Sequence, residues 1–96
     1  MTLIGRWVII STDSHALEIF GDVLLNFEEG GNLTYITRSD DKQQIMRMRY
    51  EVDGRTIITD QPSAPRVERT PFSFSENGLL TLLFGGEAVT FRRAYA

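Results

Sequence analysis

The sequence predicts an all-β fold, an eight-stranded antiparallel up-and-down barrel, from three observations. Apolar and polar residues alternate with a period of two along most of the chain, as they do in half-buried strands. Glycine pairs and Asp-Gly or Asn-Gly steps separate these segments, which is typical of hairpins. Sequential antiparallel strands joined by hairpins favour a closed barrel, because closure removes the unpaired edges of an open sheet.

The first half of the chain contributes three predicted strands, at residues 3–10, 22–28 and 32–38. Gly30-Gly31 is expected to form a tight hairpin between the last two. Residues 11–21 connect the first strand to the second and contain Asp13 and Ser14, typical N-cap residues, ahead of an apolar stretch. We therefore expect a short helical or irregular segment here, lying over one mouth of the barrel.

The fourth predicted strand, residues 43–52, alternates most clearly. Met46, Met48 and Tyr50 fall on one face, and arginine side chains fall on the other. This strand is therefore expected to have one buried face, turned toward the core, and one solvent-exposed face.

The second half of the chain adds four shorter predicted strands, at residues 56–60, 72–75, 79–84 and 88–93. Asp53-Gly54 and Asn77-Gly78 are typical of two-residue type I′ turns, which need positive φ angles. Residues 61–65 contain two prolines and are expected to form a stiff exposed loop. Pro71 has no N–H for a ladder, so the sixth strand either begins beside it or carries a bulge there.

Length and composition indicate a single domain, residues 1–96, with 42% hydrophobic and 24% charged residues, enough for a packed core. The net charge of −3 disfavours a nucleic-acid partner, because a phosphate backbone repels an acidic surface. The chain has no cysteine, which excludes thiolate metal sites and cysteine nucleophiles.

No apolar run approaches the roughly 18 residues of a membrane-spanning helix. We expect a cytoplasmic protein, or a periplasmic or secreted one if a signal peptide precedes this sequence.

The two ends of the chain carry matching motifs. Gly5-Arg6-Trp7 opens the first strand, and an arginine lies near the end of the last. Between them, residues 27–35 and 50–54 are segments with the sequence of hairpin turns and their flanking strands. Together they resemble the calycin superfamily and, within it, small bacterial lipocalin-like domains. In that superfamily the tryptophan packs under an arginine of the final strand and plugs one end of the barrel. The resemblance implies this role for Trp7 and Arg93, since alternation places Arg93 rather than Arg92 on the inward face.

A contact between Trp7 and Arg93 also has a physical rationale of its own. A guanidinium stacked on an indole ring gains about 1–2 kcal/mol when it is shielded from water. We therefore expect this pair to act as the closure of the barrel.

The inward faces of the strands carry many large side chains. The inferred inward set is Trp7, Ile9, Val23, Leu25, Phe27, Leu33, Tyr35, Met46, Met48, Tyr50, Phe72, Phe74, Leu82, Phe84 and Phe91. An eight-stranded barrel is just wide enough to be filled by its side chains or to hold one small ligand. A ligand site, if present, is expected to be lined by Phe27, Tyr35, Met46, Met48 and Tyr50, with both tyrosine hydroxyls at the same end of the interior. The alternative is that these side chains only fill the core.

Apolar residues also occur on the outer faces of the first and seventh strands. In a closed barrel these strands flank the eighth, so a single outer patch is expected from Ile4, Val8, Ile10, Leu79 and Leu83. We expect a homodimer through this face, or a cover formed by residues 11–21.

Two function classes follow from these observations. The first is a non-enzymatic, lipocalin-like binding protein for a small hydrophobic or amphipathic ligand in the barrel interior. The second is a protein-interaction module with a fully packed barrel, an inhibitor or immunity-type protein resembling the staphostatin type of protease inhibitor. Its contact is then expected at the 61–65 loop or at the basic stripe of Arg47 and Arg49. The sequence shows no paired acid and base, nucleophile elbow or metal-ligand spacing, so we expect no enzyme activity, metal or cofactor.

Overall fold

The fold is taken from a computed structural model that describes residues 2–10, 22–39, 42–61, 67–84 and 86–94. The strands in these ranges are β1 (Gly5–Ile9), β2 (Asp22–Glu28), β3 (Asn32–Ser39), β4 (Lys42–Asp53), β5 (Thr56–Asp60), β6 (Val67–Phe74), β7 (Leu80–Phe84) and β8 (Glu87–Arg93). Each strand pairs antiparallel with the next, and β8 pairs with β1, which closes the barrel. The predicted eight-stranded up-and-down barrel is confirmed. The helical or irregular segment expected over residues 11–21 lies outside the described residues.

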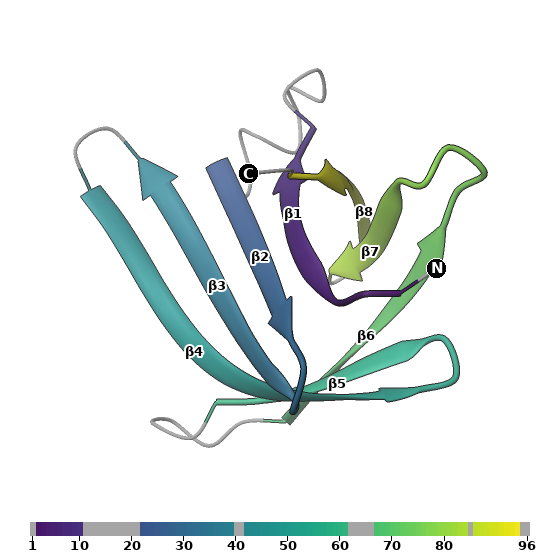
Figure 1. The fold of residues 1–96 in the computed structure, drawn as a ribbon, viewed down its shortest axis with the longest axis horizontal. Helices are drawn as coiled ribbons and strands as arrows, with labels where there is room; N and C mark the ends of the chain where they lie inside the picture. Colours follow the sequence, from purple (N-terminus) through teal and green to yellow (C-terminus); the bar gives the residue numbers. More distant parts are fainter. Residues whose placement is uncertain (1, 11–21, 40–41, 62–66, 85, 95–96) are drawn as a thin grey trace.

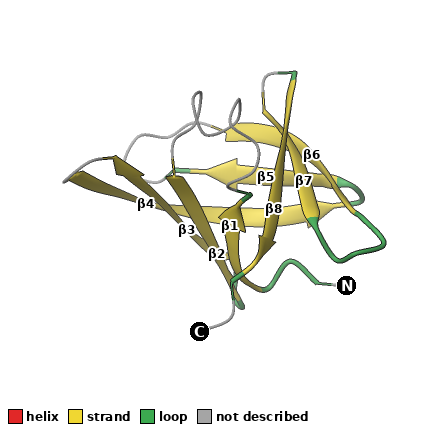
Figure 2. Ribbon diagram, turned by 90° about the horizontal axis from the view of Figure 1, so that it is seen from above, coloured by secondary structure: helices red, strands yellow, loops and turns green. Residues whose placement is uncertain are grey.

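The strands form two flanks joined by β1. Figure 1 shows β2, β3 and β4 side by side on one flank and β7 and β8 on the other, with β1 between β2 and β8. In the view turned by 90°, strands of the two flanks run in clearly different directions (Figure 2). This crossing is the result of strand twist and of the tilt that a closed barrel requires. Within the described ranges, no helix has the length and apolar character needed to cross a lipid bilayer.

Two strands change partner along their length. In β4, residues 42–49 pair with β3, and residues 49–53 pair with β5. In β6, residues 67–71 pair with β5, and residues 72–74 pair with β7. The β6–β7 ladder therefore covers only residues 72–74 of β6, whereas every residue of β5 pairs with both β4 and β6.

The sixth strand is longer than predicted, because it spans Val67–Phe74 instead of residues 72–75 and runs through Pro71. The Phe72 N–H donates to the Arg55 carbonyl at 2.9 Å, on the β5 side. Successive backbone nitrogens point in opposite directions, so the nitrogen of Pro71 faces β7 and no bond to β5 is lost. The missing N–H ends the β6–β7 ladder and leaves the strand intact.

The turn between β6 and β7 also differs from the predicted two-residue turn. The Ser75 N–H donates to the Leu79 carbonyl at 2.9 Å, and the Gly78 N–H donates to the Ser75 carbonyl at 3.0 Å. Residues 76–78 therefore form a three-residue loop with Gly78 at a φ of 79°, a common hairpin geometry in which a left-handed residue follows a type I turn. As a result β7 begins at Leu80, one residue later than predicted.

The hydrophobic core lies inside the barrel. Its buried members are Leu3, Trp7, Ile9, Val23, Leu25, Phe27, Leu33, Ile57, Leu80, Leu82, Val89 and Phe91. Tyr35, Met48, Tyr50, Phe72, Phe74 and Phe84 are partly buried against them. Most of the inferred inward set belongs to this core, and Leu3, Ile57, Leu80 and Val89 add to it. Met46 differs, because 38% of its surface is exposed.

Candidate functional site

One end of the barrel is closed by Trp7 and Arg93, which β1 and β8 place directly opposite each other. The Cζ atom of Arg93 lies 4.2 Å from the centroid of the Trp7 ring, and Trp7 is only 1% exposed. The Trp7 Nε1–H donates to the Leu3 carbonyl at 2.9 Å. Nη1 and Nη2 of Arg93 donate to the carbonyls of Ile4 and Thr2. The last strand is thus tied to the segment that precedes the first.

Gly5 makes room for this arrangement. Its φ is +126°, in a region that residues with a side chain rarely adopt. A Cβ atom at this position would collide with Nη1 of Arg93. The positive φ therefore favours glycine at this position of the Gly5-Arg6-Trp7 motif, and the missing Cβ leaves room for the guanidinium.

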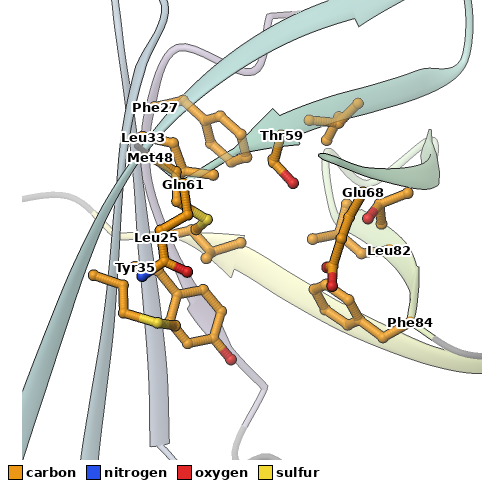
Figure 3. A pocket seen from close by; sticks show the side chains of 13 residues that line it. Leu25, Phe27, Leu33, Tyr35, Met48, Thr59, Gln61, Glu68, Leu82 and Phe84 are labelled. Carbon is orange, nitrogen blue, oxygen red and sulfur yellow. The ribbon is translucent and has the colours of Figure 1, made fainter. Parts of the chain in front are cut away.

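The rest of the interior holds a cavity of about 330 Å³ (Figure 3). Its lining residues are Leu25, Phe27, Leu33, Tyr35, Met46, Met48, Ile57, Thr59, Gln61, Glu68, Thr70, Leu82 and Phe84. In Figure 3 the β2–β4 side chains of Leu25, Tyr35 and Met48 face Leu82 and Phe84 of β7 across the open space. The barrel is therefore not fully packed.

The cavity is apolar in its depth and polar toward its opening. Leu25, Leu33 and Leu82 are among the buried core residues of its wall. Polar atoms come from the end of β5 and the start of β6, where Thr59 pairs with Glu68 in the sheet register. An apolar wall with a few polar groups is typical of sites that bind small molecules.

Four of the five predicted lining residues lie on this cavity: Phe27, Tyr35, Met46 and Met48. The β3–β4 register explains two of the contacts, because Tyr35 pairs with Met46 and Leu33 pairs with Met48. Met46 is the most exposed of the four and lies closest to the start of β4, at the opening.

Tyr50 does not line this cavity. Its N–H donates to the carbonyl of Gly31, just before β3, at 2.9 Å, so Tyr50 lies level with a residue four positions before Tyr35. Its ring packs edge-on against Phe27 at a centroid distance of 5.0 Å, and its hydroxyl donates to the Glu28 carbonyl at 3.1 Å. The two tyrosine hydroxyls therefore do not meet at one end of the interior. Tyr50 instead lines a second cleft of about 270 Å³ at the closed end of the barrel.

Tyr35 is the aromatic hydroxyl of the cavity. Burial raises the pKa of Tyr35 above its usual value. The hydroxyl therefore keeps its proton at neutral pH, and it can both donate and accept a hydrogen bond.

The cavity also has polar lining residues that were not predicted from the sequence: Thr59, Gln61, Glu68 and Thr70. A signal for the first two exists, because alternation from Ile57 places positions 59 and 61 on the inward face of β5. No such signal exists for the β6 residues, since Pro71 hides the first half of that strand.

The surface residues considered for partner contacts are spread over the barrel. On the outer face Val8 lies opposite Arg92, which interrupts the apolar patch expected around β8. Val8 is instead continuous with an apolar row across β2, β3 and β4, formed by Leu24, Ile36 and Ile45. The homodimer through Ile4, Val8, Ile10, Leu79 and Leu83 stays a prediction.

The contact regions of the interaction-module alternative are described only in part. Arg49 donates through Nη2 to the Gly30 carbonyl at 3.3 Å, and Arg47 and Arg49 are exposed on β4. Of the predicted 61–65 loop, Gln61 lies within the described residues and contributes to the cavity. In the described ranges, no group of three or more acidic or histidine side chains is arranged to hold a metal ion.

No family model matches this chain, and neither a curated protein nor a solved structure is significantly similar to it. The resemblance to the calycin superfamily therefore stays a prediction.

Proposed function

We propose that this protein is a non-enzymatic, lipocalin-like binding protein that holds one small, mainly apolar ligand inside its barrel. The supporting observation is the cavity of about 330 Å³ between β2–β4 and β5–β7. A barrel whose only task is to present its outer surface has no need of such a space, because unfilled apolar volume costs stability.

The cavity volume sets the size of the ligand. At about 30 Å³ per water-sized group, 330 Å³ corresponds to roughly eleven such groups. A ligand of roughly nine to twelve non-hydrogen atoms therefore matches the space. Its apolar part would contact Leu25, Leu33 and Leu82, and its polar part would face the open end near Tyr35 and Gln61.

Isothermal titration calorimetry with 1-octanol tests this proposal, because the alcohol has nine non-hydrogen atoms and no charge. We expect one site per chain with a Kd of the order of 0.1–1 mM, since small ligands gain about 0.5 kcal/mol per non-hydrogen atom in such sites. Absence of saturable binding would contradict the proposed function.

A matched pair of variants locates the site. Thr59→Trp places a large side chain in the cavity and is expected to weaken 1-octanol binding at least about tenfold. Thr56→Trp makes the same change on the opposite face of β5 and is expected to leave the Kd within about twofold. Equal effects of the two variants would place the alcohol elsewhere. Near-ultraviolet circular dichroism checks that both variants are folded.

A further inference from the structure

We propose that two copies of this chain pair through the exposed edge of β4, so that the sheets of the two barrels join in antiparallel register. The surface is the part of β4 that precedes its partner change, residues 42–48, and is called the β4 edge below. The pairing does not depend on the proposed ligand, because it is made by backbone groups at the edge of the sheet.

Among the described residues, the β4 edge has a neighbouring strand on one side only. β3 pairs with β4 from residue 42 to residue 49, whereas β5 pairs with it from residue 49 to residue 53. Figure 1 shows β4 as the outermost strand of the flank that it forms with β2 and β3. All residues from Lys42 to Arg47 are exposed. A further strand can therefore reach this edge.

The backbone groups at the β4 edge are arranged for such a strand. The Tyr50 N–H donates to the Gly31 carbonyl, on the β3 side. Because the backbone groups of successive residues point in opposite directions, those of Gln43, Ile45 and Arg47 point away from β3. Each of these residues thus offers one N–H and one C=O to an incoming strand, and such a row is a template for pairing.

The β4 edge has little of the protection that usually keeps edge strands apart, namely proline, bulges or central charges. Its sequence contains no proline or glycine, and its pairing with β3 runs without a bulge. Its charged residues, Lys42 and Arg47, lie toward its ends, and the residues between them are uncharged. The middle of the edge is therefore suited to pairing.

A second copy of the β4 edge fits this surface when Ile45 lies at the two-fold axis. In antiparallel register Ile45 then opposes its own counterpart, and Gln43 of each copy opposes Arg47 of the other. Each of these pairs exchanges two backbone hydrogen bonds. Lys42 of each copy opposes Met48 of the other, so no like charges lie directly opposite. The edge is thus self-complementary.

The pairing also covers exposed apolar surface. Ile45 is 52% exposed and ends the outer row that runs through Leu24 and Ile36. In the dimer the two isoleucines meet, and the rows of the two copies become continuous. A strand of another protein gains the same backbone bonds but need not carry an isoleucine at this position. A second copy is therefore the favoured partner.

On the inner face of the sheet, the second copy contributes to the opening of the cavity. Met46 lines the cavity and is 38% exposed. In the same register Gln44 of the second copy lies opposite Met46. Dimerisation thereby adds a polar side chain beside the opening.

Sedimentation velocity of the full chain between about 5 and 500 μM tests the proposal. We expect a monomer–dimer equilibrium with a Kd of the order of 10–100 μM, because one pair of edge strands buries less surface than a standard-size interface. Ile45→Lys places two lysines at the axis and is expected to raise this Kd at least about tenfold. Gln43→Pro removes an N–H that faces the edge, keeps the β3 ladder, and is expected to weaken the dimer by a similar factor.

Leu83→Lys is the matched control. Leu83 is also a large apolar residue, 42% exposed on β7, and it belongs to the other outer patch from which a dimer is predicted. We expect this variant to leave the Kd within about twofold. Near-ultraviolet circular dichroism checks that all the variants are folded.

Cross-linking tests the register independently of affinity. The chain contains no cysteine, so Ile45→Cys introduces one thiol per chain. Opposed residues of a hydrogen-bonded antiparallel pair lie about 5.5 Å apart at Cα, within reach of a disulfide. We expect mild oxidation to convert most of this variant to a covalent dimer and to leave Leu83→Cys largely monomeric.

A chain that stays monomeric at every concentration would overturn the proposal. A dimer that Leu83→Lys disrupts and Ile45→Lys does not, or an Ile45→Cys variant that cross-links no faster than Leu83→Cys, would also overturn it. The proposed function is tested separately by 1-octanol binding, so failure of the dimer and failure of the ligand site are distinguishable.

Discussion

Replacing Trp7 by alanine removes the side chain on which the closed end of the barrel depends. The indole is 1% exposed, stacks under Arg93 and packs against Phe74 at a ring-centroid distance of 6.0 Å. Its Nε1–H also satisfies the Leu3 carbonyl. The substitution therefore creates a cavity, leaves a buried carbonyl without its donor, and deprives the Arg93 guanidinium of its aromatic partner.

The expected loss in the free energy of unfolding is about 4–5 kcal/mol, near the upper end of the range for large aromatic residues in cores. A chain of 96 residues has a total stability of about 5–14 kcal/mol. Trp7→Ala should consequently lose between about a third and nearly all of this stability at 25 °C. Urea unfolding followed by far-ultraviolet circular dichroism measures the loss, since the variant has no tryptophan left to report by fluorescence.

Leu83→Ala is the control, because Leu83 is a large apolar residue with 42% of its surface exposed. We expect this variant to change the free energy of unfolding by about 0.5 kcal/mol or less. A loss below about 1.5 kcal/mol for Trp7→Ala, with an unchanged urea dependence, would refute the assignment of Trp7 as the closure of the barrel. A stable Trp7→Ala variant that no longer binds 1-octanol would place the tryptophan in the ligand site.

Three further substitutions test other parts of the structure. Gly5→Ala is expected to lower the free energy of unfolding by about 2–3 kcal/mol in the same urea assay, since an alanine is strained at this positive φ and its Cβ meets Arg93. Wild-type stability of this variant would contradict the described path of the guanidinium. Tyr35→Phe is expected to reduce the alkaline loss of stability. Burial raises the folded-state pKa of Tyr35, so the folded state holds this proton more tightly, and its contribution is lost as pH rises above about 10 through the folded pKa. Urea unfolding at pH 9 and at about pH 11 measures the difference, and an equal decline in wild type and variant would speak against a buried hydroxyl. Met46→Ala is expected to lower the free energy of unfolding by less than about 1 kcal/mol, because Met46 is 38% exposed. The same variant is expected to weaken 1-octanol binding about threefold. Calorimetry that shows unchanged binding would remove Met46 from the site.

The fold was predictable because strand alternation and turn residues are local features. The inward faces of β2 and β4 follow from alternation alone, and closure follows from the absence of long crossovers. The contact between Trp7 and Arg93 was expected from the resemblance to the calycin superfamily, with alternation choosing Arg93 over Arg92, and the structure places the two residues in contact.

Features that depend on distant residues were harder to predict. In the sequence Pro71 indicates a strand boundary. In the structure its nitrogen faces β7, and the β6–β7 ladder covers only residues 72–74. The pairing with β5 is therefore kept, and β6 continues through Pro71. The position of Tyr50 depends on the β3–β4 register, which places it at Gly31 and away from Tyr35. Alternation assigns a side chain to a face but does not assign it a level along the barrel.

The existence of the cavity could not be derived from composition. The inferred inward residues have enough volume to suggest a filled interior, and a decision between filled and hollow requires the positions of the strands. Those positions include the partner changes in β4 and β6, which no local pattern in the sequence indicates.

Intermolecular nuclear Overhauser effects from bound 1-octanol would show whether the barrel interior is the binding site. We expect contacts from the alkyl chain to the methyl groups of Leu25, Leu33 and Leu82, which line the cavity. Contacts confined to Leu24 and Leu83 on the outer surface would contradict it.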